Sequence, residues 1–152
     1  MFPMRYLEKF AKDYHELPII YFITPTDNMR LTQLADLTRL RNTLWLVPKL
    51  VWIIIEDSHI KTKKITDFIE SSNMECVHLN QMTPAEMKIS SFNRTFIKGA
   101  FQRNKGINWL RKYVNVEAEG VVYFGDDDNT YDIRLFEEVN KNNKYFSCIF
   151  HL

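Results

Sequence analysis

The chain has 152 residues, and its 20 Lys and Arg against 19 Asp and Glu give a formal charge of +1. This length suits one domain with a single core, and the near-neutral balance offers no general attraction to nucleic acid or to an anionic membrane. No apolar run reaches the roughly 18 residues that a membrane span needs, and the N-terminus lacks a signal-peptide core. We therefore expect one domain, no nucleic-acid partner and no membrane span.

Apolar runs alternate with amphipathic segments along the chain. Short runs rich in β-branched and aromatic residues predict strands at 19–24, 50–55, 75–79, 121–124 and 145–150. Apolar residues at helical spacing, which in the first case run from Leu31 to Leu44, predict helices at 31–44, 65–71, 102–113 and 133–139. Because strands that alternate with helices form parallel sheets, we expect a Rossmann-like α/β fold with a mostly parallel sheet flanked by helices.

Residues 80–98 form a polar connection of a length that is usually reserved for function or mobility. This connection contains a candidate N-glycosylation site at Asn93, which would accept a glycan in a secretory lumen. Each of the two cysteines, Cys76 and Cys148, lies in an apolar run where a free buried thiol is expected.

Three consecutive carboxylates, Asp126, Asp127 and Asp128, follow directly on the strand at 121–124. Adjacent carboxylates at a strand end repel one another unless a cation or hydrogen-bond donors lie beside them. Two interpretations are open: a turn whose last members cap the next helix, or a site for Mg²⁺ or Mn²⁺, which takes carboxylates together with substrate phosphates. The four histidines are scattered and offer no rival metal site.

Ligands of open α/β sheets bind beyond the carboxyl ends of the strands, so the polar residues that follow each strand matter most. Besides the triplet, these residues are Pro25, Thr26, Asp27 and Asp57. Arg103 lies on the helix before the triplet and can hold a carboxylate or a phosphate oxygen. Because no glycine-rich phosphate loop is present, the pattern favours a nucleotide diphosphate that a metal and an arginine neutralise.

A receiver-type signalling domain is a rival interpretation, because it also gathers acids at strand ends around Mg²⁺. Such a domain needs an acid pair after its first strand, where this chain has Thr24-Pro25-Thr26. It also needs an aspartate after its third strand, where this chain has Leu79-Asn80-Gln81. The sequence therefore favours the nucleotide site.

Short motifs between about residues 18 and 139 resemble one family in their order along the chain. They are residues 23–26, 35–40, 44–48, 52–57, 102–105 and 120–131. These motifs resemble the nucleotide-binding half of the β-1,3-glucuronosyltransferases. The resemblance implies a nucleotide-diphospho-sugar transferase type of fold, with an N-terminal extension at 1–17, a donor domain at 18–139 and a divergent tail at 140–152.

The resemblance also implies how the nucleoside is bound. Pro25 and Thr26 would line the uridine pocket, and Asp57 would accept a hydrogen bond from uracil. Two positions depart from the family: Asp27 replaces a tyrosine that stacks on uracil, and Lys98 replaces an arginine. Because lysine lacks the planar fork of arginine, we expect weaker donor binding.

At the diphosphate, the resemblance implies that Arg103 contacts the donor and orients Asp126. Asp127 would hold the ribose, and Asp128 would bind Mn²⁺ between the two phosphates. The metal and the arginine would stabilise the departing UDP.

As a whole, the resemblance implies an inverting transfer of glucuronic acid from UDP-glucuronate to the 3-hydroxyl of a galactose in a proteoglycan linker or glycoprotein glycan. The family's acceptor half and its catalytic base would lie beyond Leu152, so no catalytic residue is expected in this chain. The alternative is a truncated, inactive fragment that binds only UDP and Mn²⁺. The resemblance further implies dimerisation and a Golgi location, although the chain carries no anchor or signal.

Overall fold

The computed structural model describes residues 17–88, 98–115 and 120–141 of the chain. Within these ranges, four strands form one sheet in the order β3-β2-β1-β4, and every neighbouring pair is parallel. The strands are β1 (Ile19–Thr26), β2 (Leu50–Glu56), β3 (Cys76–Asn80) and β4 (Gly120–Phe124). The predicted Rossmann-like α/β class is confirmed. The strand predicted at 145–150, Cys148 and the sequon at Asn93 lie outside the described residues.

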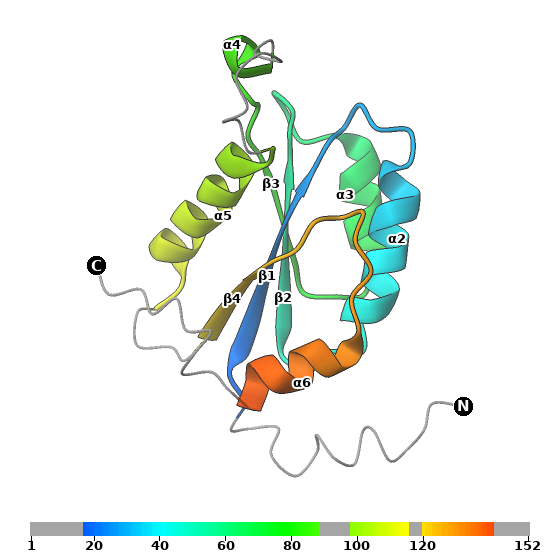
Figure 1. The fold of residues 1–152 in the computed structure, drawn as a ribbon. Helices are drawn as coiled ribbons and strands as arrows, with labels where there is room; N and C mark the ends of the chain where they lie inside the picture. Colours follow the sequence, from blue (N-terminus) through cyan, green and yellow to red (C-terminus); the bar gives the residue numbers. More distant parts are fainter. Residues whose placement is uncertain (1–16, 89–97, 116–119, 142–152) are drawn as a thin grey trace.

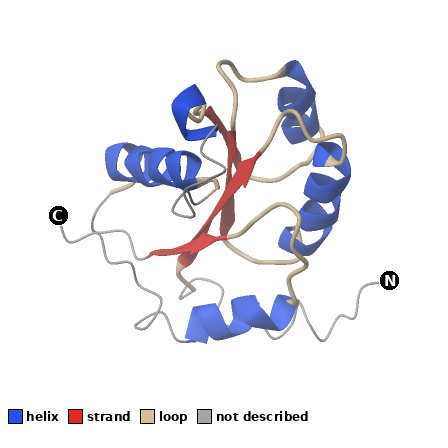
Figure 2. Ribbon diagram, turned by 45° about the horizontal axis from the view of Figure 1, so that its top comes forward, coloured by secondary structure: helices blue, strands red, loops and turns tan. Residues whose placement is uncertain are grey.

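Helices cover both faces of the sheet (Figure 1). One face carries α2 (Gln33–Leu44), α3 (Lys63–Glu70) and α6 (Ile133–Lys141), and the other carries α5 (Ala100–Tyr113), as the view in Figure 2 also shows. A short helix, α4 (Ala85–Lys88), lies in the polar connection at residues 80–98. The bounds of the other elements differ from the predicted ones by one or two residues. No helix of the described ranges is long and apolar enough to cross a membrane.

The core has two layers because successive side chains of a strand point to opposite faces. On one face, Phe22 and Trp52 pack against Leu37 and Leu40 of α2, and on the other, Ile23 packs in a second cluster beneath α5. Burial of each such side chain stabilises the fold by about 1.5–3 kcal/mol. As predicted, β1 and β2 are buried on both faces.

The prediction of which residues form the apolar face of the first helix is partly wrong. Leu31 precedes α2 and is fully exposed, and Leu34 is exposed as well. Gln33 takes an inward position instead, where its Nε2 donates to Thr26 Oγ1 at 3.0 Å. A polar contact at the end of the sheet therefore sets the start of this helix.

β1 extends through Pro25 and Thr26, two residues further than predicted. Ile20 donates its N–H toward β2, and Ile23 accepts one from Gly125 on the β4 side, so residues of β1 turn alternately to the two neighbours. Pro25 turns to the β4 side, where the pairing of β4 with β1 ends at Ile23. Because no partner strand needs an N–H there, proline is tolerated.

Glu56 ends β2 and is fully buried. Its carboxylate accepts hydrogen bonds from the N–H of Thr62 at 2.8 Å and the hydroxyl of Thr62 at 2.7 Å, and it lies 2.8 Å from Nε2 of His78. Thr62 is the N-cap residue of α3, so Glu56 connects the end of the strand to the start of this helix. Both carboxylate oxygens of Glu56 are thus bonded to residues inside the domain. The next residue, Asp57, is less buried and lies at the edge of the sheet.

Gly125 lets the chain pass close to an aromatic cluster immediately before the acidic triplet. A Cβ at this position would lie 2.0 Å from Cζ of Phe22. The ring of Phe22 is itself held between Tyr123, in a stacked contact, and Tyr131, in an edge contact, each with a centroid distance of 5.4 Å. Glycine is therefore required by close packing, and this packing directs Asp126 and Asp127 to the edge.

We expect the change Gly125→Ala to lower the free energy of unfolding by about 1–3 kcal/mol, because the added methyl group overpacks the core against Phe22. Combining it with Phe22→Leu should cost less than the sum of the two single changes, since the smaller side chain makes room for the methyl group. Urea unfolding of the three variants measures both effects. Strictly additive losses would show that Phe22 is not the obstacle.

Candidate functional site

The sheet brings four carboxylates together beyond its carboxyl ends, and we call Asp57, Asp126, Asp127 and Asp128 the acidic edge. Thr26, at the end of β1, links its two sides. The carbonyl oxygen of Thr26 accepts the N–H of Asp57 at 2.8 Å, and its hydroxyl donates to Oδ2 of Asp127 at 2.7 Å. The parallel register thus places residues that are far apart in the sequence at one site.

Asp127 is the buried member of the triplet, with 3% of its surface exposed. Burial raises the pKa of its carboxyl group, and the hydrogen bond from Thr26 and the charge of Arg30 oppose this shift. Nη1 of Arg30 lies 2.9 Å from Oδ1 of Asp127. For Arg30, burial disfavours the charged form, but Asp127 and Asp36 outweigh burial and raise the pKa of the guanidinium. Asp127 thus favours the charged form of Arg30, while Arg30 only opposes the effect of burial on Asp127.

Two arginines tie α2 to the triplet. Arg30 forms an ion pair with Asp36 through Nη2, while Arg39 donates to Oδ1 of Asp36 at 3.2 Å and to the backbone oxygen of Asp128 at 2.8 Å. The sequence did not identify Arg30 or Arg39 as site residues. The only local signal was the spacing of Asp36 and Arg39 on one helix face, and Arg30 is separated from Asp127 by 97 positions.

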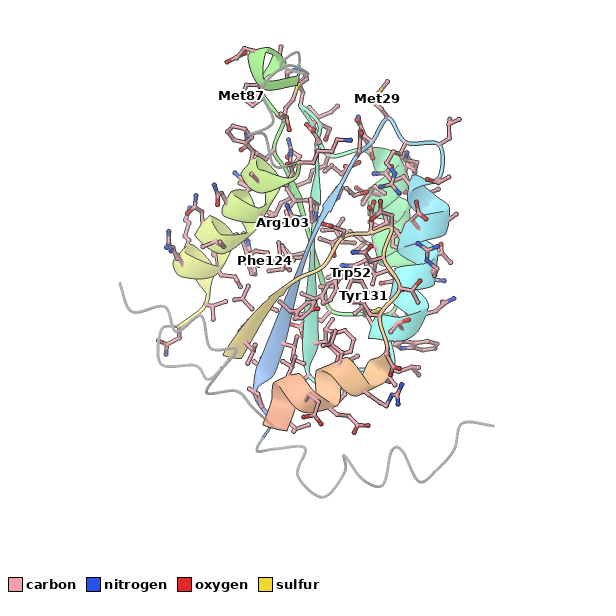
Figure 3. The ribbon with its side chains drawn as sticks, in the orientation of Figure 1. Met29, Trp52, Met87, Arg103, Phe124 and Tyr131 are labelled. Atoms are coloured by element: carbon pink, nitrogen blue, oxygen red, sulfur yellow. The ribbon has the colours of Figure 1, made fainter. Side chains whose placement is uncertain are left out.

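On the other face of the sheet, Arg103 of α5 forms an ion pair with Asp126, as predicted. Its Nη1 also donates to the backbone oxygen of Lys98 at 2.7 Å. In Figure 3, Arg103 extends from the first turns of α5. The structure therefore directs Asp126 toward α5 and Asp127 toward α2.

Pro25 and Lys98 lie near the start of α5. Gly99 has a φ of 78°, and a Cβ there would lie 2.9 Å from both Cγ of Pro25 and Nη1 of Arg103. Glycine thus allows the helix to begin directly against the end of β1. Lys98 is exposed. Asp27 is exposed too, and its Oδ1 accepts the N–H of Met29 at 2.9 Å, which closes a turn.

Asp128 is the most exposed carboxylate of the triplet, with 58% of its side chain accessible. Its Oδ2 lies 3.4 Å from Nη1 of Arg30, which is a weak contact. No group of three or more His, Cys, Asp or Glu side chains in the described parts of the chain is arranged to hold a metal ion. The three neighbouring aspartates diverge, so a metal here would need Asp128 together with oxygens of a ligand.

Asp57 is half-buried, and Thr83 holds both of its oxygens. The N–H of Thr83 donates to Oδ1 at 2.7 Å, and its hydroxyl donates to Oδ2 at 2.8 Å. Behind them, Nε2 of Gln102 donates to the hydroxyl of Thr83 at 3.2 Å. Sequence reasoning missed both partners, because Thr83 precedes a proline in a long connection and resembles an ordinary turn residue.

We expect Arg30→Ala to lower the free energy of unfolding by about 2 kcal/mol, because the buried carboxyl group of Asp127 would lose its cation and would either stay charged without it or take up a proton. The value is below that of a fully buried pair because about one-third of the Arg30 side chain is exposed. Denaturant unfolding measures the change. As a control, Lys63→Ala removes the exposed pair with Asp67 and should have no measurable effect. Equal results for the two variants would contradict this role of Arg30.

The parallel sheet and its polar edge define an open α/β domain whose ligands would bind at the carboxyl ends of the strands. The model of glycosyltransferase family 43 matches residues 40–148 and so extends past the boundary predicted at 139. The chain belongs to this family.

Three relatives illustrate the similarity. The chain is 47% identical over 126 residues to galactosylgalactosylxylosylprotein 3-beta-glucuronosyltransferase sqv-8 of Caenorhabditis elegans, a match that covers 82% of the chain and 35% of the relative. It is 39% identical over 140 residues to galactosylgalactosylxylosylprotein 3-beta-glucuronosyltransferase I of Drosophila melanogaster, a match that covers 90% of the chain and 45% of the relative. It is 39% identical over 132 residues to galactosylgalactosylxylosylprotein 3-beta-glucuronosyltransferase 1 of Homo sapiens, a match that covers 84% of the chain and 39% of the relative. The chain thus spans less than half the length of these relatives.

Proposed function

We propose that this chain binds UDP-glucuronate and forms the donor-binding part of a β-1,3-glucuronosyltransferase. The observation that carries the proposal is the Arg103–Asp126 ion pair beside the exposed Asp128 at the end of β4. This arrangement offers a cation and a carboxylate at the place where open sheets bind nucleotides. The names of the relatives point to the same chemistry.

The proposal assigns Mn²⁺ to Asp128. A carboxylate that is exposed and weakly bonded suits an ion that keeps the remaining positions for water and phosphate oxygens. When bound, Mn²⁺ would supply positive charge between the two phosphates and favour departure of UDP. Arg103, oriented by Asp126, would contribute a second positive charge on the donor.

The nucleoside would lie along the ends of β1 and β2. Pro25 and Thr26 would line the uridine pocket, and Asp57 would accept the N3–H of uracil, because a carboxylate can accept more hydrogen bonds than the two that Thr83 donates. Asp127 would contribute to the ribose site. Its burial with Thr26 and Arg30 also supports a second role, which is to hold the triplet in place.

Two positions would weaken donor binding. Asp27 offers no ring to stack on uracil, and its carboxylate closes the turn with Met29. Lys98 supplies a point charge in place of a planar guanidinium.

For the whole protein, the proposed reaction is an inverting transfer of glucuronic acid to the 3-hydroxyl of a galactose, in a proteoglycan linker or a glycoprotein glycan. The names of the relatives contain galactosylgalactosylxylosylprotein and so support this class of acceptor. Because the proposed reaction modifies such glycans, we propose a Golgi location for the whole protein. We also propose that it works as a dimer. A second candidate is that the residues of this chain, taken by themselves, bind UDP and Mn²⁺ without transferring sugar.

We expect isothermal titration calorimetry to show UDP binding that requires Mn²⁺. Asp128→Ala should abolish this Mn²⁺-dependent binding of UDP, because it removes the most exposed carboxylate of the triplet, to which the ion is assigned. Asp67→Ala, at an exposed aspartate on α3, is the matched control and should bind like the original chain. Equal UDP binding with and without Mn²⁺ would contradict the proposed site.

A transfer assay separates the two candidates. With Mn²⁺, UDP-glucuronate and a galactoside acceptor, an active chain should release UDP and form a glucuronosyl galactoside. An acceptor hydroxyl without a base to take its proton reacts slowly, so the binding-only candidate predicts UDP affinity without product. Lack of turnover at saturating donor would rule out transferase activity for this chain but leave the binding proposal standing.

A further inference from the structure

A buried relay of two polar side chains lies behind Asp57. Gln102, in the first turn of α5, contacts Thr83, and Thr83 contacts Asp57. Gln102 and Thr83 are both buried, so neither is placed to touch a ligand directly. We propose that these two positioning residues orient Asp57 so that the site prefers uracil to cytosine, an inference that rests on the proposed UDP site.

The direction of donation along the relay is settled by its contacts. Nε2 of Gln102 lies 2.6 Å from the backbone oxygen of Gln81, which only accepts, and 3.2 Å from the hydroxyl of Thr83. The hydroxyl hydrogen of Thr83 is used toward Oδ2 of Asp57, so this oxygen accepts from Gln102. The amide orientation of Gln102 is therefore fixed: Nε2 donates to Gln81 and to Thr83, and Thr83 donates to Asp57.

The other end of the Gln102 amide supports a role beyond packing. Its Oε1 is buried and has no hydrogen-bond partner among the residues that the structure describes. A buried acceptor without a donor costs stability, which an apolar side chain of similar size would avoid. Gln102 therefore contributes through the two hydrogen bonds that its Nε2 donates, one of which goes to the hydroxyl of Thr83.

The relay matters for base selection because uracil and cytosine differ at N3. Uracil presents an N–H donor there, whereas neutral cytosine presents a lone pair that faces a carboxylate unfavourably. A carboxylate that can rotate would adapt to the amino group of cytosine. Asp57 is held at both oxygens by Thr83, so it can accept from uracil but cannot readily follow cytosine.

Calorimetric affinities of the full chain for UDP and for CDP, each with Mn²⁺, test the inference. Thr83→Val keeps the backbone N–H but removes the hydroxyl, and the preference for UDP over CDP should fall about tenfold, the usual effect of one hydrogen bond to a charged group. Gln102→Leu should lower the preference less, because it acts through Thr83. Thr83→Ser should restore the preference, and Thr66→Val, the same change on α3, should leave it intact.

The outcomes separate this inference from the proposed function. If Thr83→Val and Gln102→Leu weaken UDP and CDP binding equally, or leave the ratio unchanged, the relay is only structural and the inference fails. If the original chain binds both nucleotides with equal affinity, the inference fails while the nucleotide site stands. Binding of neither nucleotide would overturn the proposed function itself. Melting temperatures show whether each variant is folded. If only one of Thr83→Val and Gln102→Leu folds, its ratio of UDP to CDP affinity is sufficient to test the inference.

Discussion

The buried carboxyl group of Asp127 is the constraint around which the polar end of the sheet is arranged. An unpaired carboxylate at this depth would be expensive, so it needs both a hydrogen-bond donor and a cation. Thr26 provides the donor because β1 extends past Pro25, and Arg30 provides the cation from the connection to α2. Arg30 is held in turn by Asp36, so the position of α2 also depends on this carboxylate.

The directions of the other two aspartates follow from this arrangement. The chain turns directly after β4, and while Asp127 contacts Thr26 and Arg30, Asp126 reaches Arg103 on α5. Asp128 lies one step further and stays largely exposed, with its backbone oxygen held by Arg39. Guanidinium groups thus neutralise the two inner carboxylates without a metal. The outer carboxylate is the one whose present contact is weak enough to exchange for another cation.

The fold was largely predictable from the sequence because it follows from hydrophobic periodicity, which the residues carry locally. The apolar runs of β1 and β2 and the triplet after β4 needed no tertiary information, and the pairing of Arg103 with Asp126 came from the family resemblance. The contributions of Arg30 and Thr83 were not predictable. Each is a common residue type in a connection, and each meets its carboxylate only after the strands align, across 97 and 26 positions respectively. The prediction that Leu31 belongs to the apolar face of the first helix was wrong for the opposite reason. Its spacing was helical, but the helix begins after it.

The first turn of α5 joins the two ends of the proposed nucleotide site. Gln102 and Arg103 are adjacent, and because successive helical residues point about 100° apart, one reaches Thr83 behind Asp57 while the other reaches Asp126. Gly99 allows this turn to lie directly against Pro25. A shift of the helix start would therefore move the support for the base contact and the cation at the phosphates together. In the proposed site, base recognition and charge neutralisation would for this reason both depend on the start of one helix, although the carboxylates involved follow different strands.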